Sequence, residues 1–487
     1  MLNFFKILII TIYCISGISF ANEEKIKNID KIRKAIVTIN SRVPVAAYLG
    51  TGSWSGTGFI VDAKEGFLVT NNHVVGKASV GTYFVTFHTG RQAEAKVAYY
   101  DLYADFAVLK VEPSELPEDF EVIEFTDEKP ALGAEVFIVG NTEGQGFSFH
   151  SGYLSDLYEI SGEMPQGSYV INMNTAGGAS GSPILNIDNK AIGVLYGGGK
   201  THSLALKGAY VTHILKDLRA NTTPSRKHIG VITELYSLDN AVKHRNFPKD
   251  EMNNYLKEFP DARNRVIVVH STVPGGTAEA QGIIAGDIIR EIDGKKIGAD
   301  LCAFDLALNL AKKDKVTLTI IRNGKKINKE VALYDIEKNK VSKMIDFAGG
   351  LFFEADDLVA AKFGIGLGKV ALANVQTGSS FSSIKEMFTN EYKSVYRLQI
   401  KALNGDKINS LDDLVSSVNK ALKQKYINIE YVNFQPFYPQ FSTAGGFISS
   451  KENLMQDITF DSIDDKPRIL KFDDTKYEWT SSVVEKK

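Results

Sequence analysis

Residues 172–183 read Asn-Met-Asn-Thr-Ala-Gly-Gly-Ala-Ser-Gly-Ser-Pro, and this stretch decides how the rest of the chain is interpreted. Strand-like runs precede and follow it, at 168–173 and 191–196. The glycines at positions 177, 178 and 181 allow a sharp turn, because glycine adopts positive φ without a steric penalty. Ser180, at the apex of such a turn, would expose its Oγ beside backbone N–H groups able to bind an oxyanion. The alternative is a hairpin loop without chemistry, since Gly and Ser are common turn residues.

The composition indicates a globular protein with much β structure. A chain of 487 residues with 44% hydrophobic residues can form several domains and bury a sizeable core. The formal net charge of −2 gives no electrostatic reason to expect a nucleic-acid partner. The 41 glycines outnumber the 13 prolines, and many short Val, Ile, Phe and Tyr runs favour strands joined by tight turns.

The N-terminal residues predict export. Lys6 supplies a positive charge, residues 7–20 are mostly apolar, and Ser19-Phe20-Ala21 is a small-residue cleavage pattern. We expect a cleaved signal peptide over residues 1–21, with an uncleaved membrane anchor as the alternative. Of the two cysteines, Cys14 lies in this segment, so Cys302 would remain alone and no intramolecular disulfide is expected.

The remaining chain divides into a β domain and a pair of similar modules. Residues 22–220 contain short strands separated by turn residues, including an expected strand at 208–212, a pattern typical of a barrel or sandwich. Further on, Ile289-Arg-Glu-Ile-Asp-Gly-Lys-Lys-Ile is echoed by Leu398-Gln-Ile-Lys-Ala-Leu-Asn-Gly-Asp-Lys-Ile, each followed by an expected helix. This is an internal repeat of roughly 100 residues. We therefore predict modules at 227–336 and 340–433, and assign no role to residues 434–487.

Three residues in the β domain form a candidate catalytic set. A serine hydroxyl needs an imidazole to take its proton and a carboxylate to hold that imidazole in the right tautomer. His73, Asp105 and Ser180 all fall near the ends of predicted strands, where a rigid scaffold can aim side chains into a cleft. Asp101 competes with Asp105 for the carboxylate role.

These blocks resemble the HtrA/DegP-type serine proteases. Thr70-Asn-Asn-His-Val-Val, Asp105-Phe-Ala-Val-Leu-Lys-Val and Gly178-Ala-Ser-Gly-Ser-Pro are similar to the family's three catalytic blocks, and Ser55-Gly-Thr-Gly-Phe-Ile-Val matches the strand before the histidine. The resemblance implies a mainly β fold, with a two-lobed chymotrypsin-like double β-barrel followed by two PDZ-like α+β domains. It covers about residues 30–433.

The resemblance also implies roles for individual residues. His73 would be general base and then general acid, Asp105 would orient it, and Ser180 would be the nucleophile. The oxyanion hole would be formed by backbone N–H groups of Gly178 and Ser180, with Ala179 as a further candidate. No metal or other cofactor is expected.

The sequence departs from the family pattern beside Ser180. Ala179 and Ser182 stand where the family usually has Asn and Gly, and the approach from Ile171 is about two residues shorter. Backbone donors survive the change at Ala179, but Ser182 would be strained if its φ were positive. Ser182 is also a rival nucleophile. The resting shape of the loop is therefore left open.

Two binding regions follow from the same resemblance. Leu195, Tyr196 and Leu206 would line a specificity pocket for small aliphatic side chains. His228, Ile229, Gly230 and Val231 match the carboxylate-binding loop of a PDZ domain, which captures a peptide C-terminus by strand addition. The helix expected at 301–311 would form the other wall of that groove, and the alternative is an interdomain packing surface. In the second module, Gly349-Gly-Leu-Phe stands in the equivalent place, and ligand binding there is left open.

The function favoured by the sequence is that of an exported serine endopeptidase acting on misfolded or unfolded envelope proteins. The expected location is the periplasm, with secretion as the alternative, and the PDZ modules would capture substrate or regulate assembly. The family resemblance implies a homo-oligomer built from trimers. Two alternatives from other classes are a chaperone or binding scaffold with a weakly active protease fold, and an adaptor that uses only its PDZ modules.

Overall fold

The structure is a computed structural model, which describes residues 29–47, 51–76, 78–162, 164–376, 378–384, 398–422, 424, 426–437, 447–459 and 467–484. The predicted signal peptide, with Cys14, lies outside the described residues. Within them, no helix has the length and apolar character needed to cross a bilayer.

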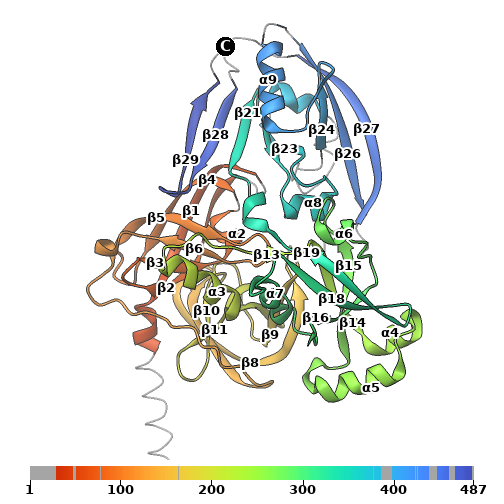
Figure 1. Cartoon of the computed structure of the whole chain (residues 1–487). Coiled ribbons are helices and arrows are strands. Elements are labelled where there is room, and N and C mark those ends of the chain that lie inside the picture. Colours follow the sequence, from red (N-terminus) through yellow and green to blue (C-terminus); the bar gives the residue numbers. More distant parts are fainter. Residues whose placement is uncertain are drawn as a thin grey trace, which may run out of the picture.

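Two closed six-stranded barrels form the β domain (Figure 1). The first closes in the order β1-β2-β3-β6-β5-β4 and contains β1 (Ile36–Ala46), β2 (Gly52–Asp62), β3 (Phe67–Thr70), β4 (Ser79–Thr86), β5 (Gln92–Tyr100) and β6 (Ala107–Lys110). The second closes in the order β10-β11-β12-β9-β8-β7 and contains β7 (Glu135–Thr142), β8 (Gln145–Ser161), β9 (Gln166–Asn172), β10 (Pro183–Leu185), β11 (Ala191–Gly198) and β12 (Ser203–Lys207). The predicted chymotrypsin-like double barrel is confirmed.

Two segments of this domain differ from the sequence prediction. The strand expected at 208–212 is the start of helix α3 (Gly208–Arg219), whose apolar residues Tyr210, Val211, Ile214 and Leu215 recur with helical spacing and pack between the barrels. The strand expected to reach His73 ends at Thr70, and His73 lies in the one-turn helix α2 (Asn72–Val75). Short β-branched runs do not distinguish a strand end from a helical turn.

The first PDZ-like unit has a sheet in the order β14-β15-β16-β18-β19. Its elements are β13 (Lys227–His228), β14 (Val231–Ser237), α4 (Leu238–Arg245), α5 (Lys249–Glu258), β15 (Arg265–Thr272), α6 (Thr277–Ala280), β16 (Ile288–Ile292), β17 (Lys295–Lys296), α7 (Leu301–Asn309), β18 (Lys315–Arg322), β19 (Lys325–Ala332) and β20 (Tyr334–Asp335). Strand β13 pairs with β20 and joins the beginning of the unit to its end.

The second PDZ-like unit repeats this order as β22-β23-β24-β26-β27. Its elements are β21 (Lys343–Phe347), β22 (Gly350–Glu354), α8 (Asp357–Phe363), β23 (Val370–Val375), β24 (Leu398–Leu403), β25 (Asp406–Lys407), α9 (Leu411–Ala421), β26 (Tyr426–Phe437), β27 (Phe447–Thr459), β28 (Arg468–Asp473) and β29 (Glu478–Val483). The boundary predicted at residue 433 is wrong, because β26 continues beyond it and β27 to β29 belong to the same sheet.

Strand β21 has no counterpart beside β14 in the first unit. It pairs antiparallel with β22, with Ile345 opposite Phe352, and β28 pairs with its other edge. Ile345 and Phe347 pack in one core with Leu411, Leu414 and Val418 of helix α9. The edge of β22 that would accept a ligand strand is therefore filled by residues 343–347 of the same chain.

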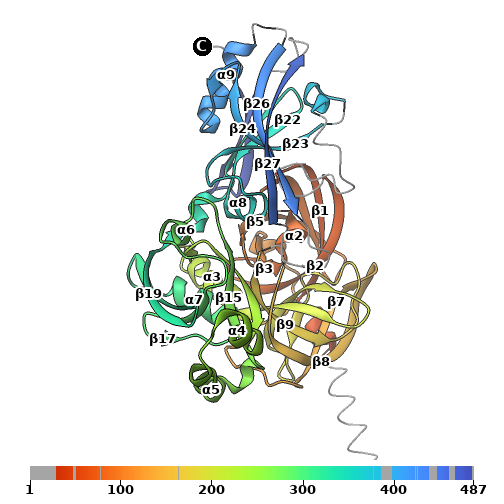
Figure 2. The same ribbon diagram turned by 90° about the vertical axis from the view of Figure 1, so that its right-hand side faces the viewer.

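The units pack closely on one another. Figure 2 shows the sheet of the second PDZ-like unit standing above the barrels and the first unit. A single apolar cluster contains Leu102 and Tyr103 of the β domain, Ile232 and Val273 of the first unit, and Phe353, Leu358 and Val432 of the second. The loop between β5 and β6 thus lies where all three parts meet.

Candidate active site

His73 and Asp105 form a two-point contact at the junction of the barrels. His73 Nδ1 lies 2.6 Å from Asp105 Oδ2, and the His73 backbone N–H donates to Asp105 Oδ1 at 3.0 Å. Since a carboxylate only accepts, the neutral imidazole carries its proton on Nδ1, which leaves Nε2 as the basic nitrogen. The His73 side chain is 39% exposed, whereas that of Asp105 is 19% exposed. The arrangement suits an imidazole that receives a proton from the solvent side.

The backbone of Asp105 is held by both barrels. Its N–H donates to Gln166 Oε1 at 2.6 Å, and its carbonyl accepts from Asn71 Nδ2 at 2.7 Å. Asp101, the competing carboxylate, is buried and accepts instead from the N–H groups of Tyr103 and Ala104, both at 2.8 Å. The carboxylate bonded to His73 is thus that of Asp105.

Hydrogen bonds to its carbonyl groups fix the loop that carries Ser180. Gly177 O accepts from Glu143 N and Gly178 O from Thr57 Oγ1, both at 2.8 Å. Ala179 O accepts from Ser182 N at 3.0 Å, and Ser180 O accepts from Thr57 N at 2.8 Å. Four consecutive peptide groups therefore have a defined orientation before any substrate binds.

The same pattern leaves two candidate oxyanion donors free. The amides of Gly178 and Ser180 make no hydrogen bond to another group in the described part of the chain, whereas the Ala179 amide donates to Ala176 O at 3.2 Å. Gly178 has a φ of 94°, and a Cβ there would lie 2.5 Å from Asn141 O, so no larger residue fits this backbone. Gly181 likewise has a φ of 89°, but Gly177 does not adopt the positive φ expected from the sequence.

Ser182, the rival nucleophile, is fully buried. Its Oγ donates to Ala179 O at 2.6 Å, and its φ is not positive, so the strain considered from the sequence does not arise. Gly140 makes room for it, because a Cβ at Gly140 would lie 2.0 Å from Ser182 Oγ. Ser182 thus stabilises the turn beside Ser180 and offers no exposed hydroxyl.

Gly56 brings the serine loop next to the histidine helix. A Cβ at Gly56 would lie 2.7 Å from a methyl group of Val74 and 3.3 Å from Ser180 O. Val74 directly follows His73, so both loops pack against the same point of strand β2. Only glycine allows this approach.

The predicted pocket residues are not brought together. Leu206 lies opposite Val194 and packs between the barrels, whereas Leu195 lies opposite Ala205 and packs inside the second barrel. Leu195 and Leu206 therefore face opposite sides of one sheet and cannot line a common pocket. Tyr196 is half-buried, and its hydroxyl is 2.9 Å from Ser168 Oγ.

The four predicted peptide-binding residues of the first PDZ-like unit are buried. His228 Nδ1 accepts from Gly230 N at 3.0 Å, which uses one N–H of the loop. Burial, together with nearby Arg226, lowers the pKa of His228 to about 3, so this ring is neutral. Ile229 and Val231 pack in the core of the first unit itself, and only the His228 ring packs against the β domain, through Tyr103.

Several residues that shape the site were missed by sequence reasoning. Thr57, Asn71 and Gln166 hold the two loops, and Arg226 and Tyr103 connect the Asp105 loop to the PDZ-like units. Thr57 stands in the quoted Ser-Gly-Thr-Gly block, which could have drawn attention to it. Asn71 likewise stands in the quoted Thr70-Asn-Asn-His block, but Gln166, Arg226 and Tyr103 have no local signal, because their partners lie far away in the chain.

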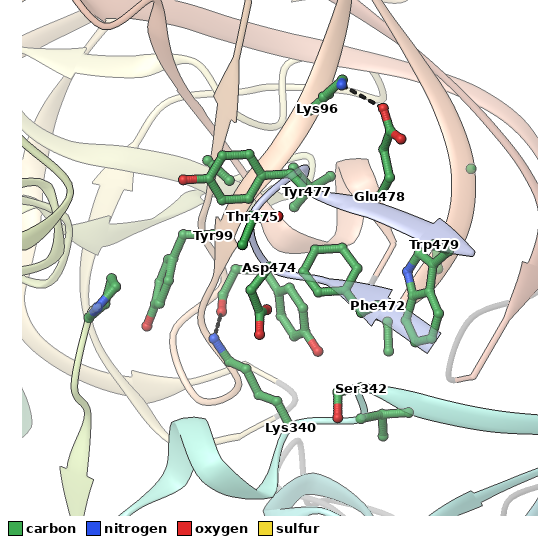
Figure 3. Close-up of a pocket in the computed structure, with 18 of the residues that line it drawn as sticks. Lys96, Tyr99, Lys340, Ser342, Phe472, Asp474, Thr475, Tyr477, Glu478 and Trp479 are labelled. Atoms are coloured by element: carbon green, nitrogen blue, oxygen red, sulfur yellow. Dashed lines mark hydrogen bonds and ion pairs between the residues drawn. The ribbon is translucent and has the colours of Figure 1, made fainter. Parts of the chain in front are cut away.

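A cavity of about 930 Å³ lies away from these residues (Figure 3). It is lined mainly by β4 and β5 of the first barrel, the segment 337–342 and the hairpin β28–β29. Lys96 and Glu478 form an ion pair across it at 2.5 Å. The C-terminal hairpin thus touches the protease barrel. Among the described residues, no group of three His, Cys, Asp or Glu side chains is placed to hold a metal ion.

Comparisons with known proteins agree with the two kinds of domain. A trypsin-like peptidase domain matches residues 56–194, and a PDZ domain matches residues 249–333. An uncharacterized protein from Rickettsia prowazekii, RP187, is 43% identical over 185 residues, which is 38% of this chain and 95% of that protein. The pro-apoptotic serine protease NMA111 of Meyerozyma guilliermondii is 26% identical over 445 residues.

The NMA111 match covers 86% of this chain but only 42% of the yeast protein, so the chain spans less than half of that relative. Among solved structures, a serine endoprotease from Yersinia pestis is 20% identical, with a TM-score of 0.42 over 63% of this chain and 96% of that one. The HtrA-type protease AlgW with tripeptide is 19% identical, with a TM-score of 0.47 over 63% of this chain and 95% of that one.

Proposed function

Because this chain belongs to the HtrA-type serine proteases, with a trypsin-like peptidase domain and a PDZ domain, we propose that His73, Asp105 and Ser180 are its catalytic triad. The observation that carries the proposal is the two-point contact between His73 and Asp105, with Nδ1 at 2.6 Å from the carboxylate. It sets the tautomer in which Nε2 accepts the proton of an attacking serine.

In the proposed reaction, Ser180 Oγ attacks the scissile carbonyl carbon while His73 Nε2 takes the hydroxyl proton. The oxyanion forms beside the amides of Gly178 and Ser180, which have no other acceptor within the described residues. His73 then gives its proton to the leaving amine, and water hydrolyses the acyl-enzyme with His73 again as base. Asp105 stays ionised and stabilises the imidazolium.

We propose unfolded or misfolded exported proteins as substrates. This part rests on the predicted signal peptide and on the family resemblance, as do a periplasmic location and a trimer-based assembly. Peptide capture at residues 228–231 would have to accommodate the Tyr103 ring, which packs on His228. In the second unit, the filled edge of β22 argues against capture by strand addition.

A cleavage assay tests the proposal. Purified full-length protein should degrade casein, and Ser180→Ala should abolish the degradation while leaving the melting temperature unchanged. Ser182→Ala is the matched control, because it removes a neighbouring hydroxyl while Ala179 O keeps the Ser182 N–H as a donor, and it should retain readily measurable cleavage. Cleavage that survives in Ser180→Ala would refute the assignment. Absence of cleavage by both proteins, with aggregation of a client still suppressed, would favour the scaffold alternative.

A further inference from the structure

The loop that carries Asp105 contacts both PDZ-like units, which lie outside the barrels. We propose that both PDZ-like units hold Asp105 in register with His73 by clamping residues 101–105, with Asp101 and Tyr103 as positioning residues. The first unit contacts the loop through Arg226 and His228, and the second contacts it through Asp357. This inference rests on the proposed triad, since its functional consequence is the orientation of His73.

Asp101 organises the loop from inside. Its Oδ1 accepts from the amides of Tyr103 and Ala104, so it folds the chain back just before Asp105. Its carbonyl accepts from Asn72 Nδ2 at 2.5 Å, which joins the loop to the helix of His73. Its Oδ2 accepts from Tyr99 Oη at 3.1 Å and from Arg226 Nε at 3.0 Å. The side chain is only 1% exposed, so this charge depends on its partners.

Arg226 ties Asp101 to the first PDZ-like unit. Its backbone N–H donates to Asp335 Oδ1 at 2.9 Å, and its carbonyl accepts from Ile336 N at 3.0 Å. Its guanidinium lies 3.8 Å from Asp305 Oδ2 on helix α7, and Asp305 accepts from Tyr210 Oη at 2.6 Å. The guanidinium is therefore placed by the unit as a whole, and it cannot follow the Asp105 loop if the unit moves away.

Tyr103 is held by both units at once. Its ring centroid lies 4.3 Å from that of His228, and its hydroxyl donates to Asp357 Oδ1 at 3.3 Å. Asp357 also accepts from Asn339 Nδ2 at 2.9 Å and from the hydroxyl of Tyr334. Leu102 and Tyr103 pack in the same apolar cluster as Phe353 and Leu358 of the second unit. Removing either unit would expose this part of the loop to water.

The geometry makes Asp105 sensitive to this clamp. Two peptide units separate Tyr103 from Asp105, a reach of roughly 7 Å, so a shift at Tyr103 is transmitted to Asp105 with little slack. Both carboxylate oxygens of Asp105 are engaged by His73, and a misplacement of about 1 Å in a catalytic group can cost about 10²-fold in rate. The charged groups that face the clamp are Asp101, Arg226, Asp305, Glu337, Lys340 and Asp357.

The first test compares point variants of the full chain. Arg226→Met removes the tie to Asp101 and should lower kcat about 10-fold or more with KM within about 2-fold of wild type. Arg226→Lys should recover part of that loss. Tyr103→Phe and Asp357→Leu should each lower kcat about 3-fold or more, and the double variant should lose no more than Asp357→Leu alone, because both changes remove the hydrogen bond from the Tyr103 hydroxyl to Asp357. The acid limb of the pH–rate profile should move to lower pH in each.

The matched control is Tyr255→Phe. Tyr255 is a fully buried tyrosine of the first PDZ-like unit, and its hydroxyl donates to Arg265 O at 2.7 Å, away from the clamp. This variant should lose stability by a similar amount and leave kcat, KM and the pH profile unchanged. A merely structural role for Tyr103 would make the two tyrosine variants behave alike, which would overturn the proposal.

A second measurement does not depend on catalysis. In the Ser180→Ala protein, the proton between His73 Nδ1 and Asp105 should give a low-field NMR resonance. It should persist in Tyr255→Phe and broaden or vanish in Tyr103→Phe and Arg226→Met. An unchanged resonance in folded Tyr103→Phe and Asp357→Leu would overturn the clamp whatever the activity. A perturbed resonance in a protein that cleaves nothing would support the clamp and refute the proposed activity.

Discussion

Thr57→Val tests whether the loop of Ser180 is held ready for catalysis by strand β2. The change keeps the shape of a fully buried side chain and removes one hydroxyl. That hydroxyl donates to Gly178 O at 2.8 Å and accepts from Asn141 N at 2.9 Å. The backbone bond from Thr57 N to Ser180 O at 2.8 Å is untouched. The variant therefore releases the Gly178–Ala179 peptide group but leaves the Ser180 carbonyl bonded to Thr57 N.

Two effects of different size result from this loss. The free energy of unfolding should fall by roughly 2–5 kcal/mol, because one acceptor and one donor in a buried region lose their partner. The rate should fall by about 10²-fold, as for the loss of one oxyanion donor, because the freed Gly178–Ala179 peptide group lies between the two peptide groups that carry the Gly178 and Ser180 N–H donors. The loss should be in kcat, because this donor acts on the transition state and not on the bound substrate.

The assay is steady-state cleavage of a fluorogenic casein, with the melting temperature measured on the same samples. Thr57→Ser keeps the hydroxyl and should recover most of kcat. Thr233→Val is the control for a buried threonine, because within the described residues its hydroxyl has no hydrogen-bond partner. A folded Thr57→Val protein with kcat within about 3-fold of wild type would refute the claim that this bond prepares the oxyanion site.

Three further predictions concern stability and binding. Gly140→Ala should lower the free energy of unfolding by about 1–3 kcal/mol, because its Cβ would overlap Ser182 Oγ. Ser182→Gly should restore stability in the double variant. If chemical denaturation shows no such rescue, Gly140 does not make room for Ser182. Burial, opposed by Arg226, raises the pKa of Asp305 to about 6. The protonated carboxyl therefore contributes its full stability below about pH 3.9, the ordinary pKa of Asp, and this contribution is lost as the pH rises through about 6. In melting curves between pH 4 and pH 7, the wild type should lose up to about 3 kcal/mol of stability, and Asp305→Asn should not show this loss. An identical pH dependence in wild type and Asp305→Asn would contradict the prediction. In hydrogen exchange, residues 343–347 should be protected with or without a peptide bearing a free C-terminus, because β21 fills the edge of β22; fast exchange there, or protection only with peptide, would show an open site.

The sequence predicted the parts of the site that depend on local chemistry. Glycines at 178 and 181 indicated positive φ, and both positions have it. A Cβ at either position would also strike a backbone carbonyl, so glycine is required there for two reasons. The order of the His73, Asp105 and Ser180 blocks pointed to a family with a chymotrypsin-like double β-barrel, and the two closed barrels confirm that fold. The repeated strand–helix order of the two modules was also recognisable, because strand and helix periodicity is local.

Features that depend on distant contacts were not predictable. Ser182 looked like a departure that could strain the loop, but Gly140, forty-two positions earlier by number, supplies the space. Residues 228–231 looked like an open carboxylate loop, yet Ile229 and Val231 pack in the core of the unit and the Tyr103 ring packs on His228. Residues 434–487 received no role from the sequence, because β28 finds its partner β21 more than a hundred residues upstream. The pocket interpretation of Leu195 and Leu206 failed because strand register, not residue type, decides which face each occupies.

The central claim is that Ser180 is a nucleophile activated by His73 and Asp105. Covalent labelling with a fluorophosphonate, read by peptide mass spectrometry, tests it most directly. We expect a single adduct on Ser180, formed much more slowly in Asp105→Asn and absent from Ser180→Ala. An adduct on Ser182, or equal labelling of wild type and Asp105→Asn, would contradict it.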